Sequence, residues 1–270
     1  MTSPLAPATA DSPEIPPGYG RLRDRVVIVF GAGSVGEGWG NGKAASVAYA
    51  REGAIVVAVD REREAAQATV SIAQQLGGRA HAYAADATNS DGVKSVVEDV
   101  LARHGRIDVL HNNVGTTVMG GPVELTEAQW DMMLDVNLKS VFLTCKHVLP
   151  TMLKQGRGVI TNISSIAAIR YTGYPYSAYY GAKAGVNQFT VGLAVQHARQ
   201  GVRANAVMPG LMNTPLIYQQ ISGQYADAAA MAKARGLLPS WAASALPALP
   251  CIPPLLTSRP AAVETISAGT

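Results

Sequence analysis

Short apolar segments alternate with longer amphipathic segments along most of this chain. The apolar segments have the length of buried strands, and most end in glycine or in a polar side chain. We expect strands at 25–33, 54–60, 80–86, 106–115, 158–165 and 202–210. Helices are expected at 42–53, 61–78, 90–104, 126–156 and 176–201, with Thr126 as an N-cap and a bend near Pro150. Strict alternation over roughly 190 residues predicts an α/β fold in which one doubly wound parallel sheet forms a single domain.

Both ends of the chain differ from this pattern. Residues 1–20 carry five prolines and little that could pack, so we expect a disordered arm. The regular domain is expected to span 21–235. Residues 236–270 form an atypical segment rich in proline and alanine, in which the prolines would interrupt a helix. A short strand at 262–269 is possible there; without it, the sheet would keep an unpaired edge.

Charge and apolar patterning exclude several classes of partner. The formal net charge is only +3 and the basic residues form no run, so no nucleic acid is expected. No uncharged apolar run reaches about 18 residues, so no membrane span is expected. The N-terminal sequence lacks the pattern of a secretory signal, which favours a cytoplasmic protein. The two cysteines, Cys145 and Cys251, have no metal-type spacing, and no metal site is expected.

A glycine-rich turn, GAGSVGEGWGNGKA, lies between the first expected strand and the first expected helix. Glycines at this place allow a tight turn and close approach of a pyrophosphate to the backbone. The helix N-terminus then offers free N–H groups and a positive dipole. The context predicts a nucleotide site of the Rossmann type, to which we assign Gly31, Gly40 and Gly42.

Acidic residues end the next two strands. Asp60 could accept hydrogen bonds from the adenosine ribose and would repel a 2′-phosphate, which favours NAD and makes NADP the less favoured cofactor. Arg61 could instead meet a phosphate or stack on adenine, although a solvated residue at the helix start is the simpler interpretation. Asp86 could bind the adenine amino group or cap the following helix.

Tyr179 and Lys183 are four residues apart in an expected helix, and Ser165 ends the fifth expected strand. Residues at i and i+4 share a helix face, so the ammonium should favour tyrosinate and lower the pKa of the phenol. The pair then becomes a candidate for proton transfer near neutral pH. His111 looks catalytic in isolation, but we expect a buried, hydrogen-bonded histidine. Tyr180 is expected to form a pocket wall or to pack, and Ser164 to act as a structural hydroxyl.

With these motifs in order, the chain resembles the short-chain dehydrogenases/reductases, in their single-domain branch. The resemblance runs from about residue 21 to about residue 216. It rests on the glycine-rich turn, AVD, ADAT, NNVG, the asparagine of LDVNL, NISS, Tyr179-x-x-x-Lys183 and VMPGLMNTP. It implies an NAD(P)-dependent oxidoreductase that interconverts a secondary alcohol and a ketone, both small molecules. Homodimers or homotetramers are usual in the family.

The resemblance also implies a role for each matched residue. Tyr179 would be the general acid/base, and Ser165 would hydrogen-bond the substrate oxygen. Lys183 would bind the nicotinamide ribose, and Asn137 would hold a water that links Lys183 to solvent. Cofactor contacts would come from Asn113, Gly115, Pro209, Gly210 and Thr214.

Two departures from the family pattern leave alternatives open. The glycine-rich turn carries five extra residues, VGEGW at 35–39. These could form a surface bulge, or Trp39 could cover the cofactor or the mouth of the site. The C-terminal segment lacks the family's usual last strand, so the enzyme could be impaired. A non-catalytic dinucleotide-binding protein is the remaining alternative, although all four catalytic-type positions are filled.

Overall fold

The computed structural model describes residues 17–221 and 238–239. Just before the predicted boundary at Arg21, the backbone N–H of Tyr19 donates to Glu52 Oε2 at 3.2 Å. The rest of the predicted N-terminal arm, and nearly all of the atypical segment 236–270 with its possible last strand, lie outside the described residues.

Six strands form one parallel sheet in the order β3-β2-β1-β4-β5-β6. They are β1 (Val26–Phe30), β2 (Ile55–Asp60), β3 (Arg79–Ala84), β4 (Val109–Asn112), β5 (Gly158–Ile163) and β6 (Val202–Val207). The chain winds outward from β1 on one side and from β4 on the other. This order confirms the doubly wound α/β fold. β7 (Met212–Asn213) and β8 (Leu238–Pro239) form a separate short pair.

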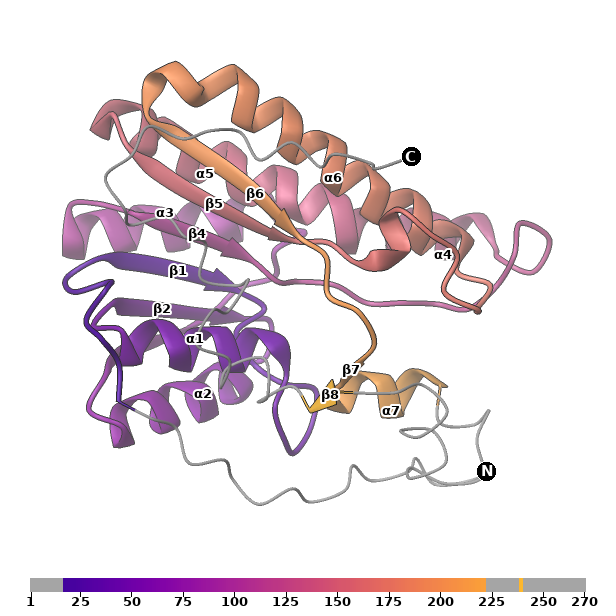
Figure 1. Ribbon diagram of the computed structural model, residues 1–270, viewed down its shortest axis with the longest axis horizontal. Coiled ribbons are helices and arrows are strands. Elements are labelled where there is room, and N and C mark those ends of the chain that lie inside the picture. Colours follow the sequence, from indigo (N-terminus) through magenta and orange to yellow (C-terminus); the bar gives the residue numbers. More distant parts are fainter. Residues whose placement is uncertain (1–16, 222–237, 240–270) are drawn as a thin grey trace.

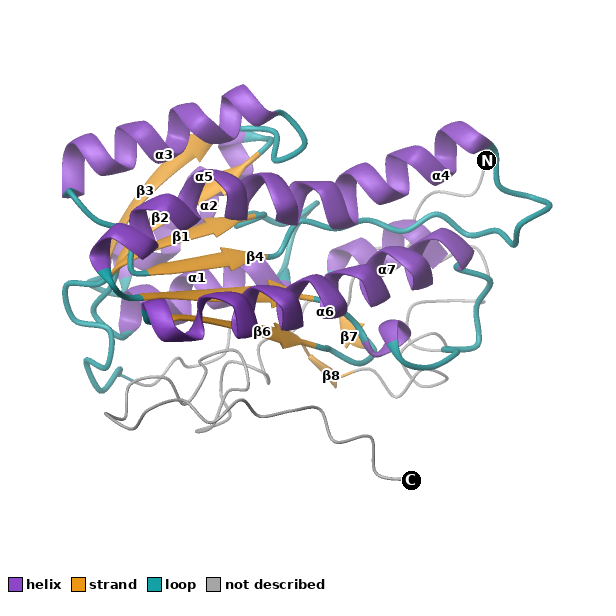
Figure 2. Cartoon of the chain, turned by 90° about the horizontal axis from the view of Figure 1, so that it is seen from above, coloured by secondary structure: helices purple, strands orange, loops and turns teal. Residues whose placement is uncertain are grey.

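Helices cover both faces of the sheet (Figures 1 and 2). They are α1 (Asn41–Arg51), α2 (Arg63–Gln75), α3 (Ser90–His104), α4 (Glu127–Leu134), α5 (Ser140–Gln155), α6 (Ser177–His197) and α7 (Pro215–Ile221). Buried side chains of α3, α5 and α6 pack on one face of the sheet, and those of α1 and α2 pack on the other. The described residues also form two short 3-10 turns, η2 (Ile166–Ala168) and η3 (Ala198–Gln200).

The prediction of a single helix at 126–156 is wrong in one respect. It begins as predicted, because Thr126 and Gln129 form a capping box at the start of α4. A π-helical turn, η1 (Asp135–Lys139), then separates α4 from α5. Asn137 lies within this turn, and its Nδ2 donates to the carbonyl of Met133 at 2.9 Å. That carbonyl would accept the backbone N–H of Asn137 in a regular α-helix, so the side chain competes with the helical ladder.

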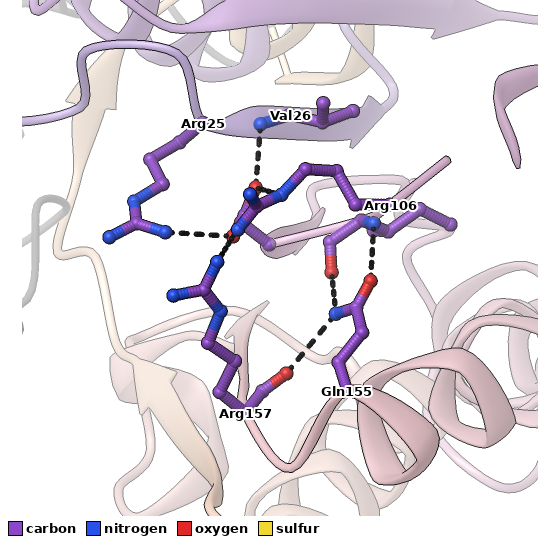
Figure 3. A network of polar contacts seen from close by, with 7 residues as sticks. Arg25, Val26, Arg106, Gln155 and Arg157 are labelled. Carbon is purple, nitrogen blue, oxygen red and sulfur yellow. Dashed lines mark hydrogen bonds and ion pairs between the residues drawn. The ribbon is translucent and has the colours of Figure 1, made fainter. Parts of the chain in front are cut away.

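A polar network joins the amino ends of three strands (Figure 3). The buried carboxylate of Asp108 accepts from the backbone N–H of Val26 at 3.0 Å and from Arg25 at 3.2 Å. It also pairs with Arg106 and lies 3.7 Å from the guanidinium of Arg157. The network secures β1, β4 and β5 at their amino ends. The predicted site residues lie at the opposite edge of the sheet, at the carboxyl ends of the strands.

Candidate active site

A cleft of about 560 Å³ runs along the carboxyl ends of the strands. It crosses the boundary between β1 and β4, where the chain reverses its direction of winding and α/β sheets bind their ligands. Most of the residues predicted for the site line this cleft: Gly31, Gly40, Asp60, Asp86, Asn113, Gly115, Ser165, Tyr179, Lys183, Pro209, Gly210 and Thr214. Gly42 and Asn137 do not line it, and both support it from behind.

The three assigned glycines of the turn have different structural tasks. Gly31 has φ +75, and a Cβ there would stand 2.9 Å from the backbone nitrogen of Val114. Gly40 is the N-cap of α1, so the helix begins at the cleft. A Cβ at Gly42 would stand 1.8 Å from the carbonyl oxygen of Gly31. Gly42 therefore permits close packing of α1 against the end of β1, and it makes no contact with the cleft.

The turn fits a pyrophosphate by its donors as well as by its shape. The first turn of α1 carries no acidic residue that would oppose an anion. Ser34 lines the cleft, and its buried hydroxyl has no hydrogen-bond partner within the described part of the chain. A buried hydroxyl without a partner is costly, and a phosphate oxygen would satisfy it. Ser34 was not among the predicted site residues, although its place directly after Gly33 is visible in the sequence.

Asp60 is bound to the backbone of the glycine-rich turn. Its Oδ2 accepts from the backbone N–H of Gly33 at 2.9 Å, and its Oδ1 accepts from that of Glu62 at 3.2 Å. The carboxylate is thereby held at the edge of the cleft. Arg61 is exposed and pairs with Glu62 at 3.3 Å, which agrees with the solvated interpretation.

Asp86 does not cap the following helix. Its Oδ1 accepts from the backbone N–H of Thr88 at 2.8 Å and from the Thr88 hydroxyl at 2.7 Å, which forms a local turn. The N-cap of α3 is Asn89, which accepts from Gly92 at 2.9 Å. The capping alternative for Asp86 is therefore wrong, because Asn89 takes that position.

The loop after β4 is tied to both halves of the cleft. Asn113 Nδ2 donates to the carbonyl of Gly31 at 2.9 Å. A Cβ at Gly115 would stand 3.0 Å from Asn137 Oδ1 and 3.3 Å from Lys183 Nζ, so only glycine leaves room for both groups. The fully buried side chain of Asn137 donates to the carbonyl of Thr116 at 3.0 Å and accepts from its N–H at 3.2 Å. Asn137 thus joins this loop to the π-helical turn.

Tyr179 and Ser165 meet in the cleft, from α6 and from the end of β5. Burial raises the pKa of Tyr179 to about 12, and a hydrogen bond with Ser165 opposes the rise. The predicted lowering of this pKa is therefore wrong for the protein alone. The Lys183 ammonium lies 5.7 Å from the centre of the Tyr179 ring and donates to the carbonyl of Ile163 at 2.8 Å. Loss of hydration outweighs the positive charge at this distance.

Lys183 is almost fully enclosed, with 3% of its surface exposed. Burial lowers the pKa of its ammonium to about 8. At neutral pH the group still carries a positive charge behind Tyr179. The neighbouring Ser164 hydroxyl donates to the Lys183 carbonyl at 3.1 Å, which confirms its predicted structural use.

The loop after β6 lines the cleft as well. Pro209 accepts from the backbone N–H of Ile166 at 3.1 Å, and so joins this loop to the one that carries Ser165. Thr214 is buried and immediately precedes α7. Pro209, Gly210 and Thr214 line the cleft together with Ser165 and Tyr179.

The residues predicted to be structural are confirmed in that use. The Tyr180 hydroxyl donates to the carbonyl of Tyr174 at 2.7 Å and accepts from the N–H of Thr172 at 3.1 Å. His111 is 1% exposed, and its Nδ1 lies 2.9 Å from the Tyr49 hydroxyl. Trp39 packs half-buried against the core beside α1, and its side chain does not line the cleft.

Comparison with known proteins agrees with this site. The family model for short chain dehydrogenase matches residues 25–224. The chain belongs to this family, and it is an NAD(P)-dependent oxidoreductase that acts on CH–OH groups. The described residues contain no helix long and apolar enough to cross a membrane, and no cluster of side chains that could hold a metal ion.

The individual relatives have different substrates. A 3-oxoacyl-(acyl-carrier-protein) reductase of Thermotoga maritima is 40% identical, over 73% of this chain and 77% of its own length. A 3beta-hydroxysteroid dehydrogenase of Mediterraneibacter gnavus is 35% identical, over 73% of this chain and 69% of its own. A crystal structure assigned to the same family, from Burkholderia xenovorans, is similar with a TM-score of 0.78 and 45% identity, over 80% of this chain and 82% of that one.

Proposed function

We propose that this enzyme oxidises a secondary alcohol or reduces the corresponding ketone with NAD as its cofactor. One observation carries the proposal: Ser165 and Tyr179 share a hydrogen bond at one end of a cleft whose other end holds Asp60. Two hydroxyls that converge there can bind one substrate oxygen. A non-catalytic dinucleotide-binding protein would not need this arrangement together with Lys183 and Asn137.

The proposed chemistry divides among these side chains. The nicotinamide supplies or accepts the hydride. Ser165 donates a hydrogen bond to the substrate oxygen and stabilises the charge that develops on it. Tyr179 gives its phenolic proton to that oxygen during reduction and takes the alcohol proton during oxidation. Lys183 binds the nicotinamide ribose and stabilises the tyrosinate. Asn137 helps to hold a water through which the proton reaches solvent.

The raised pKa of Tyr179 bears on the direction of reaction. A phenol with a pKa of about 12 is protonated at neutral pH and is ready to act as an acid. Oxidation needs tyrosinate as the base, so its rate should increase with pH. The Lys183 ammonium, whose burial lowers its pKa to about 8, favours the tyrosinate as long as it stays charged.

Asp60 supports NAD over NADP. Its carboxylate is held at the cleft edge by two backbone N–H groups, where it can accept from the ribose hydroxyls and repel a 2′-phosphate. Asp86 and Asn113 would contact the adenine side of the cofactor, and Gly115 would leave room for it beside Lys183. Pro209, Gly210 and Thr214 would hold its nicotinamide.

The walls beside Tyr179 support a partly apolar, partly aromatic substrate pocket. Tyr176 is buried and stacks on Tyr174 with ring centroids 5.5 Å apart, while Tyr179 meets its edge at 5.9 Å. Met212 and Ile217 line the nearby cleft. Tyr171, a third tyrosine of this loop, is 71% exposed.

Assembly and location are further parts of the proposal. Large apolar side chains are exposed on the long helices: Trp130, Phe142, Val191 and Val195. We propose that these helices pair in a homodimer or homotetramer that works in the cytoplasm. Residues 21–235 would form the catalytic domain.

A substrate screen tests the function. Purified protein is mixed with secondary alcohols and NAD or NADP, or with ketones and the reduced cofactors. The absorbance of the reduced nicotinamide is followed in each reaction. Turnover of apolar secondary alcohols or ketones with NAD is expected. Cofactor binding without turnover across the panel would favour the non-catalytic alternative. A strong preference for NADP would contradict the role given to Asp60.

A further inference from the structure

The five extra residues of the glycine-rich turn, 35–39, are held in place by a buried lysine. Lys43 lies in the first turn of α1 and is 8% exposed. Its Nζ donates to the carbonyl of Gly38 at 2.8 Å. An ammonium at this place is unfavourable, because it is buried and faces the positive end of its own helix. Burial indeed lowers the pKa of Lys43. Helix stability therefore does not explain why a lysine occupies this position, and its hydrogen bond to the extra residues indicates another role.

The extra residues reach across to the other side of the cleft. Gly38 has φ +106, and a Cβ there would stand 3.4 Å from Cγ of Pro215, the first residue of α7. Pro215 is buried and lines the cleft beside Thr214. In Figure 1 the loop between β1 and α1 extends toward α7. Two segments that lie far apart in the sequence thus meet at the rim.

Both segments also contribute to the lining of the cleft, which includes Ser34, Val35 and Gly40 from the turn and Thr214, Pro215 and Leu216 from the segment that begins α7. Asp60 marks one end and Tyr179 the other. A dinucleotide that reaches from Asp60 to Tyr179 has to pass the place where the extra residues and α7 meet.

We propose that residues 35–39, held by Lys43 and lying beside Pro215, form a strap that slows release of the dinucleotide. This inference rests on the proposed cofactor site, and it adds a positioning role for Lys43. Release would require Gly38 and Pro215 to separate. The strap would set the dissociation rate of the cofactor, and it would change the chemical step little because neither Lys43 nor Gly38 reaches Ser165 or Tyr179.

Release kinetics of NADH test the strap. Stopped-flow fluorescence follows NADH displaced by excess NAD from the wild type and from Lys43→Met, which keeps the apolar stem of the side chain and removes its donor. A second variant, Pro215→Ala, removes the other side of the contact. Lys94→Met is the matched control, because Lys94 is 57% exposed and pairs only across the surface of α3. We expect about three- to tenfold faster release in both test variants and no change in the control.

The double variant Lys43→Met/Pro215→Ala separates a strap from two independent effects. If both residues act through one contact, the double variant releases NADH no faster than the faster single variant. The strap proposal would be overturned if Pro215→Ala released NADH at the wild-type rate. It would also be overturned if the rate increase in the double variant were the product of the two single increases. In that case Lys43 would act on the pyrophosphate by its charge or on the helix alone. Failure of the wild type to bind NADH would refute the cofactor proposal itself.

Discussion

Replacing Gly42 by alanine should damage the cofactor site even though Gly42 makes no contact with the cleft. The added Cβ would stand 1.8 Å from the carbonyl oxygen of Gly31, and 2.6 Å from Nδ2 of Asn113, which donates to that same oxygen. Contacts of a Cβ under 3.0 Å essentially do not occur, so α1 has to move away from β1 by roughly 1 Å or more. Overpacking of this kind costs about 1–3 kcal/mol. For a domain of this size the melting temperature should fall by about 2–12 °C.

The displacement also moves the N-terminus of α1, where we propose that the pyrophosphate binds. A misplacement of about 1 Å can cost up to about 100-fold where geometry is tight, so we expect NADH affinity to fall by at least about tenfold. The assays are thermal melting by circular dichroism and NADH fluorescence titration. Gly192→Ala is the control: this exposed residue lies within α6, and nothing lies within 4 Å of its added Cβ. It should stabilise the protein by about 0.5–1 kcal/mol. Wild-type melting and NADH affinity in Gly42→Ala would refute this account of the turn.

Three further variants test other parts of the structure. Asp60→Ala should weaken NAD binding by about tenfold or more and improve NADP relative to NAD, measured by titration with both cofactors; an unchanged preference would remove Asp60 from cofactor selection. Burial lowers the pKa of His111 to about 4 from an ordinary value of 6.5. Between pH 6.5 and pH 4 the unfolded chain therefore binds one proton more than the folded protein, so the free energy of unfolding falls as the pH drops through this range. The loss should reach about 3 kcal/mol, and acid unfolding of His111→Gln should lack it. Asp108→Ala leaves the buried Val26 N–H without its acceptor and three partly exposed arginines without their carboxylate. It should cost about 1–3 kcal/mol in denaturant unfolding, while residual activity per folded molecule stays unchanged.

Most of the fold could be predicted because its local signals agree with its tertiary structure. Residues 26–30 are all apolar and all buried, as a central parallel strand requires. Thr126 and Gln129 have the spacing of a capping box, and the structure forms it. The cleft residues follow the carboxyl ends of the strands, and parallel pairing brings those ends to one edge.

What could not be predicted depends on three-dimensional neighbours. The π-helical turn at Asn137 requires Thr116, which lies on another loop, to hold the asparagine side chain. The pKa of Tyr179 depends on how far burial outweighs Lys183, and four-residue spacing cannot supply that balance. Asp86 and Asn89 were equally good caps by residue type, and only the chain path selects Asn89. The hydrogen bond from Lys43 to the carbonyl of Gly38 likewise spans a turn whose path the sequence does not define.

Proton transfer by Tyr179 is the central claim, and turnover of Tyr179→Phe is its most direct test. The matched control is Tyr180→Phe, because the Tyr180 hydroxyl only supports the loop at Thr172 and Tyr174. With a substrate found by the screen, Tyr179→Phe should lose at least about 100-fold in kcat while its NADH affinity stays near that of the wild type. Tyr180→Phe should retain most of its activity. Turnover of Tyr179→Phe at the wild-type rate would contradict the account.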